Sequence, residues 1–207
     1  FIPVYVNMEE HKKRRFVNNL MTAVILVASV LTVLGILMAP VIIRLVAPGF
    51  DDETIALAVS LIRIIFPMIV FMGMSSLAGA YLQSHHHFLA PSMMAIPNNL
   101  IIIGTIIFAG TTGIYGLAVA TVVGVLSQFI LQYPVLKRYG YRYRPVLSLA
   151  DPGLRRIGEL AVPVILGTMV GQVNSLADKI LASTLSSGNV SALDYANKIN
   201  GMVLAMF

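Results

Sequence analysis

The feature that most constrains this chain is an uninterrupted apolar stretch at residues 20–43, where 24 residues carry no charge. At a rise of about 1.5 Å per residue, such a helix can cross the roughly 30 Å hydrocarbon core of a bilayer. Further long apolar stretches occupy residues 55–83, 88–109, 117–136 and 160–185. Because 57% of the 207 residues are hydrophobic and only 11% are charged, a soluble fold could not bury them in one core. The sequence therefore predicts an all-α, polytopic transmembrane helical bundle.

The chain divides into four parts in sequence order. We interpret residues 1–6 as the tail of a preceding transmembrane helix, and residues 7–137 as a basic loop followed by four transmembrane helices. Residues 138–159 form a basic linker with an amphipathic segment, and residues 160–207 hold two more helices. The chain starts without Met and both ends fall in apolar runs, so we expect an internal piece of a longer protein. About six membrane helices are predicted in total.

The basic residues indicate an orientation in the membrane. Ten of the fourteen Lys and Arg residues lie in the loop 7–16 and in the stretch 137–159. The opposite loops, at 46–54, 110–116 and 186–189, are acidic or neutral. Since cytoplasmic loops carry an excess of positive charge, the basic side should be cytoplasmic. The net charge of +5 therefore belongs to loops beside membrane spans, and we expect membrane lipids and no nucleic acid as partners.

Four ionisable side chains interrupt the last two predicted helices, namely Asp178 and Lys179 in the first and Asp194 and Lys198 in the second. A charge inside the bilayer costs several kcal/mol unless it meets a partner or a water-filled cavity. If the turn at 186–189 marks the membrane edge, Asp178 and Lys198 both lie roughly 13 to 15 Å below it and can pair. The alternative to a functional cavity is a structural ion pair that holds the two helices in register.

Arg63 and the consecutive histidines are two other candidates for a substrate or metal site. Arg63 lies about 12 Å into its predicted helix and could contact an anionic substrate or, equally, extend to the lipid headgroups. The consecutive histidines His85 to His87 point in different directions and have no cysteine or carboxylate nearby, so we interpret them as a polar turn. The sequence carries no nucleophile elbow, phosphate loop or HExxH pair. Buried charges without these motifs favour transport over catalysis.

Two features of the predicted helices concern packing. Pro67 lies inside the stretch 55–83 and predicts a kink, because proline removes a backbone hydrogen bond. Gly116, Ala120 and Gly124 repeat at a four-residue spacing that lets two membrane helices approach closely. Neither feature predicts a reaction or a ligand.

Seven motifs, in order along the chain, carry a family resemblance. They are FIPVY, LVAPGF, RIIFP, LAGAYLQSHHHFLAP, GLAVATVVGVLSQ, YRYRPVL and PVILGTMVGQVNSLADKILASTLSSGNVSALDYANKI. Each is weak alone, but with this order and spacing the whole chain resembles the MurJ/MviN lipid II flippases of the MOP exporter superfamily. The resemblance implies about fourteen helices in two six-helix lobes plus a terminal pair, of which this chain covers the end of the second helix to the eighth.

The resemblance also implies a function. The family moves lipid II, the undecaprenyl-diphosphate-linked peptidoglycan precursor, across the bacterial plasma membrane by alternating access through a cationic cavity between the lobes. The chain is therefore expected to belong to a transporter and not to an enzyme, with lipid II and membrane lipids as partners. No organic cofactor is expected, and the protein is expected to be a monomer.

Three residues match family site positions. Lys198 stands where the family usually carries Arg in an Ala-x-Arg pattern, and because Lys lacks the bidentate fork, diphosphate binding should be looser. Ser191 matches a cavity-lining position and could donate a hydrogen bond. Asp178 matches a position that helps hold sodium in some relatives, which makes sodium a candidate coupling ion beside the membrane potential. With Arg63, the expected substrate-binding set is Lys198, Ser191 and Arg63.

Other functions remain open from the sequence. The nearest alternative is another MOP-type carrier, either a lipid-linked oligosaccharide flippase or a multidrug/cation antiporter. An antiporter for cationic drugs should favour acidic cavities, which this chain does not predict. A membrane-embedded enzyme acting on polyprenyl phosphates would use Lys198 and Asp178 catalytically and would alter its substrate. A purely structural scaffold would tolerate neutral residues at both positions.

Overall fold

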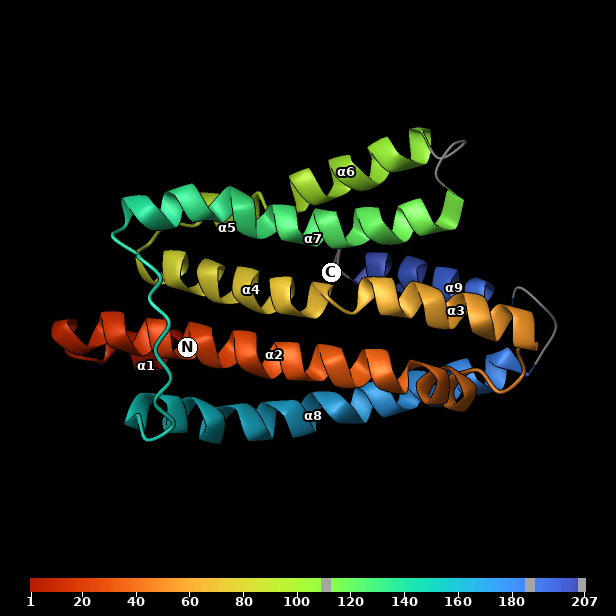
Figure 1. Cartoon of the computed structure of the whole chain (residues 1–207), viewed down its shortest axis with the longest axis horizontal. Coiled ribbons are helices and arrows are strands. Elements are labelled where there is room, and N and C mark those ends of the chain that lie inside the picture. Colours follow the sequence, from red (N-terminus) through yellow and green to blue (C-terminus); the bar gives the residue numbers. More distant parts are fainter. Residues whose placement is uncertain (109–112, 185–188, 205–207) are drawn as a thin grey trace. The chain divides into compact units, whose positions relative to one another are not determined.

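The computed structural model describes residues 1–108, 113–184 and 189–204, and its described secondary structure is entirely helical (Figure 1). The helices are α1 (Ile2–Val6), α2 (Glu10–Val46), α3 (Asp52–Ile65), α4 (Met68–Ser84), α5 (Leu89–Ser92), α6 (Ala95–Ile107), α7 (Gly113–Arg138), α8 (Pro152–Ser183) and α9 (Asn189–Leu204). The predicted fold class is thus confirmed. Residues 110–112 of the predicted loop, residues 186–188 of the predicted turn, and the end of the last helix lie outside the described residues.

Among the described residues, five helical segments are long and apolar enough to cross a membrane. They are Glu10–Val46, Asp52–Ser84, Leu89–Ile107, Gly113–Arg138 and Pro152–Ser183. About six were expected; α9, with 16 described residues, is shorter than the others and is not among them.

The basic segment 7–16 is the first point where the sequence interpretation was wrong, because α2 already begins at Glu10. Two acidic residues stabilise this start. Glu9 pairs with Lys12 at 2.7 Å, and Glu10 pairs with Lys13, both three residues apart in sequence. Hydrogen bonding to Lys12 lowers the pKa of Glu9. Acidic groups at a helix N-terminus, followed by basic groups one turn later, favour helix over loop.

The predicted kink at Pro67 is present as a break between α3 and α4, at Phe66 and Pro67. The hydroxyl of Thr32 on α2 donates to the Phe66 carbonyl at 3.3 Å, in addition to the Ile69 N–H at 3.0 Å. At the start of α3, Asp51 accepts hydrogen bonds from the backbone N–H and the hydroxyl of Thr54. These bonds lower the pKa of Asp51 and make it the N-cap of α3.

The predicted amphipathic segment 151–159 is helical and forms the first turns of α8. Asp151 caps this helix by accepting from the N–H groups of Gly153 and Leu154 at 2.8 and 3.3 Å. Pro163 lies inside the helix without ending it. One continuous helix therefore joins the linker to the charged membrane segment.

The chain forms two compact units. Unit 1 comprises Phe1–Ile36 and Leu61–Ala161, and unit 2 comprises Leu37–Ser60 and Val162–Phe207.

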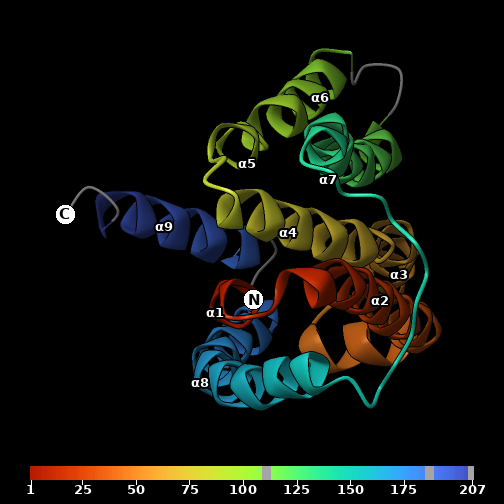
Figure 2. The same ribbon diagram turned by 90° about the vertical axis from the view of Figure 1, so that its left-hand side faces the viewer.

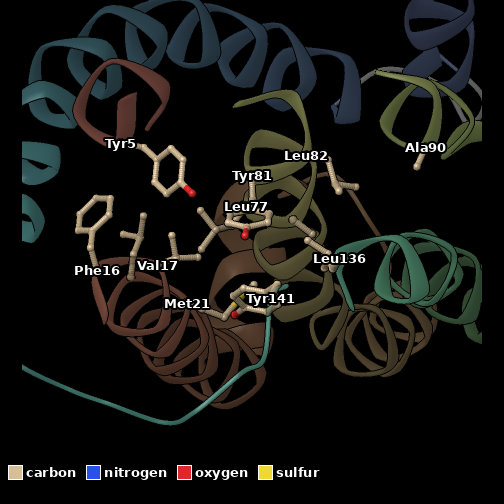
Figure 3. Close-up of a cluster of buried hydrophobic side chains, with 12 residues drawn as sticks. Tyr5, Phe16, Val17, Met21, Leu77, Tyr81, Leu82, Ala90, Leu136 and Tyr141 are labelled. Atoms are coloured by element: carbon tan, nitrogen blue, oxygen red, sulfur yellow. The ribbon is translucent and has the colours of Figure 1, made fainter. Parts of the chain in front are cut away.

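In unit 1, α7 packs against both α4 and α6 (Figures 1 and 2). A Cβ atom at Gly124 would lie 2.5 Å from the side-chain oxygen of Asn98 on α6, so a larger residue would displace the Asn98 side chain. The small-residue spacing in α7 is thus a packing feature at Gly124, as predicted. A cluster of buried apolar side chains from α1, α2, α4, α5, α7 and the linker forms the core of this unit (Figure 3).

Two adjacent asparagines on α2 hold the linker that follows α7. Asn19, which is fully buried, donates to the Ser148 carbonyl at 2.9 Å and accepts from the Ser148 N–H at 2.7 Å. Asn18 makes longer bonds of 3.4 and 3.3 Å to the Arg142 carbonyl and the Arg144 N–H. We call Asn18 and Asn19 the asparagine clamp. It supplies hydrogen-bond partners for backbone N–H and carbonyl groups of the linker, which has no regular secondary structure to pair them.

In unit 2, the loop before α3 lies against the end of α8. A Cβ atom at Gly49 would overlap the Ser183 carbonyl oxygen, so the two backbones touch at this glycine. Ser183 is itself buried. The contact fixes the end of α8 immediately before the helix that carries the remaining charged residues.

Candidate functional site

The charged residues of unit 2 form an ion pair between α8 and α9. Nζ of Lys179 lies 3.4 Å from Oδ1 of Asp194, and each side chain is 44% exposed. The expected pairing of Asp178 with Lys198 was wrong: no ion pair joins them within residues 113–184 and 189–204. The ion pair ties the two helices together and neutralises two charges, as the structural interpretation predicted for a different pair.

Helix ends explain why this pair forms. Lys179 lies four residues before the end of α8 at Ser183, and Asp194 lies five residues after the start of α9 at Asn189. At about 1.5 Å per residue, the two depths are roughly 6 and 7.5 Å. Asp178 and Lys198 would lie about 7.5 and 13.5 Å from the same ends. The paired residues are therefore better matched in depth.

Lys198 is a cation on α9 that takes no part in the ion pair. Its Nζ lies 5.6 Å from the ring centroid of Tyr195, and its side chain is exposed. In the part of α8 and α9 that the structure describes, no carboxylate lies within ion-pair distance of this ammonium. A cation–π contact at an exposed site contributes only about 0.5–1 kcal/mol, so the ammonium keeps its capacity for an anion.

Ser191 and Asp178 are exposed, on α9 and α8 respectively. Successive residues of a helix are rotated by about 100° around its axis. Because Lys179 faces α9, its neighbour Asp178 lies on a different side of α8. Among the described residues, no group of three or more His, Asp or Glu side chains could hold a metal ion. A sodium role for Asp178 therefore stays a prediction.

Arg63 lies in unit 1, on α3, where its Nε donates to the Ile36 carbonyl on α2 at 3.4 Å. That oxygen lacks its usual helical donor, because the residue four positions later is Pro40, which has no N–H. The sequence interpretation of Arg63 considered a substrate or the lipid headgroups and missed this partner. The signal was a proline inside α2, which predicts an unsatisfied carbonyl one turn earlier.

The three histidines belong to the short link between α4 and α5, consistent with a turn. Nδ1 of His85 lies 2.9 Å from the Tyr81 carbonyl, and its Nε2 lies 3.5 Å from the Tyr5 hydroxyl. Tyr81 donates to the Tyr139 carbonyl at 3.2 Å, and its ring lies 5.4 Å from that of Tyr141. Burial raises the pKa of Tyr141. This aromatic cluster, partly drawn in Figure 3, was not predicted from the sequence.

Two hollows in unit 1 have no predicted site residue in their lining. One, of about 620 Å³, is lined by Lys12, Arg15 and the start of α8, among others. The second, of about 480 Å³, lies between α5 and α7. Two residues that line the first hollow already have an acidic neighbour, since Lys12 pairs with Glu9 and His11 lies 3.6 Å from the same carboxylate, so part of the hollow's positive charge is neutralised.

The fold and the charged helices define a polytopic α-helical membrane protein with an exposed cation beside an interhelical ion pair. Comparisons narrow this class. The family model described as "Lipid II flippase MurJ" matches residues 1–207. The chain belongs to the MurJ family.

Individual relatives agree with this assignment. The chain is 30% identical to a probable lipid II flippase MurJ of Buchnera aphidicola subsp. Baizongia pistaciae, over 100% of this chain and 42% of that protein. It is 30% identical to the lipid II flippase MurJ of Burkholderia cenocepacia, over 96% of this chain and 41% of that protein. A solved structure of lipid II flippase MurJ in an inward closed conformation matches the fold with a TM-score of 0.81 and 21% sequence identity. The match covers 98% of this chain and 42% of the chain in that structure. The chain thus spans about two fifths of these relatives.

Proposed function

We propose that the protein to which this chain belongs is a lipid II flippase of the bacterial plasma membrane. The match of the family model to residues 1–207 carries the proposal. The exposed ammonium of Lys198, which has no ion-pair partner among the described residues, supports it chemically. A diphosphate cannot cross hydrocarbon unaided, so a flippase must offer cations in a hydrated cleft while the lipid tail stays in the bilayer.

The proposed roles of the site residues follow their environments. Lys198 binds the diphosphate, and Ser191, on the same helix seven residues earlier, donates a hydrogen bond to the headgroup. Arg63 takes a smaller part in binding, since its Nε is occupied by the Ile36 carbonyl. The ion pair of Lys179 and Asp194 holds α8 and α9 in register and does not touch the substrate.

The transport cycle is proposed to be alternating access between two lobes, by a monomer. The protein moves its substrate without altering it, so it is a transporter and not an enzyme. The basic loops face the cytoplasm, where the excess of Lys and Arg belongs. Substrate therefore enters from the cytoplasmic leaflet and leaves in the outer leaflet.

Depletion and rescue tests this function. In a bacterium whose own lipid II flippase can be shut off, the full-length parent gene should restore cell-wall growth, and Lys198→Ala should not. Lys137→Ala is the matched control, because Lys137 also lies over a tyrosine ring, at 4.6 Å from the Tyr133 centroid, and is not a site residue. A wild-type protein that reaches the membrane but fails to rescue would favour a different lipid-linked substrate. Full rescue by Lys198→Ala would remove the diphosphate role.

Sodium coupling through Asp178 is a separate part of the proposal. Its carboxylate is exposed and has the oxygen chemistry that sodium requires, with the remaining ligands supplied by parts of the protein beyond this chain. Flipping by the wild type should fall when sodium is replaced by potassium at constant membrane potential, and Asp178→Asn should lose this dependence. Wild-type flipping that ignores sodium would leave the membrane potential as the driver.

A further inference from the structure

The hollow of about 480 Å³ in unit 1 has an apolar wall within two membrane-spanning segments. Leu89 and Met93 line one side, at α5, and Leu131 and Val135 line the other, on α7. Leu89 is 66% exposed and Met93 41% exposed. Both sides belong to helical segments long and apolar enough to cross a membrane. The occupant of this groove must therefore be apolar where it touches the wall.

The other end of the groove is polar. It is formed by Arg138, the last residue of α7, by Tyr139, and by His87 from the link between α4 and α5. The rings of His87 and Tyr139 lie 5.4 Å apart, which fixes the imidazole at the end of the groove. Within residues 1–108, 113–184 and 189–204, no carboxylate lies within ion-pair distance of Arg138 or His87. The end of the groove thus offers a guanidinium without an acidic partner.

We propose that this groove binds a phospholipid with an anionic headgroup. One acyl chain lies along the Leu89 and Leu131 wall, and the phosphate accepts hydrogen bonds from the Arg138 guanidinium and the His87 imidazole. Arginine suits this task because its planar fork matches phosphate oxygens, and tyrosine belongs at headgroup level. The volume falls within the roughly 300–1,000 Å³ of ordinary ligand sites. This site goes beyond the proposed flippase function and does not depend on it.

Lipid retention by the purified full-length protein tests the site. In native mass spectrometry with equal amounts of phosphatidylglycerol and phosphatidylcholine, the wild type should retain phosphatidylglycerol preferentially. Arg138→Gln should weaken that retention about tenfold, as expected for loss of a charge-assisted hydrogen bond. Lys137→Gln removes the same charge one residue away, from a side chain that covers Tyr133 and does not line the groove, and should change nothing.

A second variant keeps the charge and fills the groove. Met93→Trp should reduce phosphatidylglycerol retention by a similar factor, which separates a groove site from general attraction to a basic surface. Equal losses in Arg138→Gln and Lys137→Gln, or no preference for phosphatidylglycerol in the wild type, would overturn the proposal. Displacement by millimolar inorganic phosphate would show an anion site without a lipid chain and would also overturn it. Displacement by a polyprenyl diphosphate at low stoichiometry would assign the groove to the substrate tail instead.

Discussion

The carbonyl of Ile36 has no backbone donor in α2, because Pro40 occupies the position that would supply one. Arg63 donates to this oxygen from α3 at 3.4 Å. An unsatisfied carbonyl in hydrocarbon costs several kcal/mol, so the side chain repairs a defect that the proline creates. This contact gives Arg63 a structural role, whether or not its remaining N–H groups meet a substrate.

A double-mutant cycle between Pro40 and Arg63 separates these roles. Arg63→Gln should lower thermal stability in the wild-type background, by about 1 kcal/mol or more for a lost hydrogen bond. In a Pro40→Ala background, the introduced alanine supplies the missing N–H, so the same change should cost less. Thermal unfolding of the full-length protein in detergent gives the four stabilities. Identical costs in both backgrounds would show that Arg63 does not serve the Ile36 carbonyl.

The asparagine clamp makes a second prediction for single residues. Asn19→Ala removes two bonds to the part-buried Ser148, whose carbonyl keeps only the longer bond from the Asp151 N–H, at a cost of about 1–3 kcal/mol. Asn18→Ala removes two longer bonds and should cost less. Trypsin cleavage after Arg142 should accelerate in both variants, since each releases the linker. Equal stability of Asn19→Ala and wild type would mean that the linker is held by other contacts.

At the scale of the helix, the ion pair between Lys179 and Asp194 is expected to fix the register of α8 against α9. Lys179→Ala or Asp194→Ala leaves one charge without its partner in apolar surroundings, at a cost of about 2.5–3.5 kcal/mol near the bilayer centre and less toward the edge. The exchange Lys179→Asp with Asp194→Lys restores a pair across the same gap and should recover most of the lost stability. Expression level and unfolding temperature in detergent measure this. An exchange variant as unstable as the single variants would argue against the pair.

Membrane spans were predictable from the sequence because they depend on local composition alone, as residues 20–43 illustrate. Their ends were less so. The basic residues in the first turns of α2 were predicted to form a loop, although Glu9 and Glu10 pair with Lys12 and Lys13 and the helix starts there. Whether Asp178 or Lys179 pairs with a residue of α9 depends on where α8 ends and on which side of α8 faces α9. A shift of one residue turns a helix by about 100°, which hydropathy does not resolve.

At the scale of the whole molecule, the chain spans about two fifths of its MurJ relatives. Its two units are continuous through α2, α3 and α8, each of which contributes residues to both. Family membership was predictable because the motifs retain their order over the whole chain. The interactions of Arg63, of the asparagine clamp and of the aromatic cluster were not, since they join residues far apart in sequence. Site roles for Lys198, Ser191 and Asp178 stay predictions.

The most direct measurement of the central claim is the leaflet distribution of lipid II in cells depleted of their own flippase. A membrane-impermeant reagent that modifies lipid II should reach it in the outer leaflet when the full-length wild type is expressed. With Lys198→Ala at equal membrane abundance, lipid II should stay protected, while Lys137→Ala should behave as the wild type. Protected lipid II with the wild type, or equal exposure with Lys198→Ala, would contradict lipid II flipping through a cationic site at Lys198.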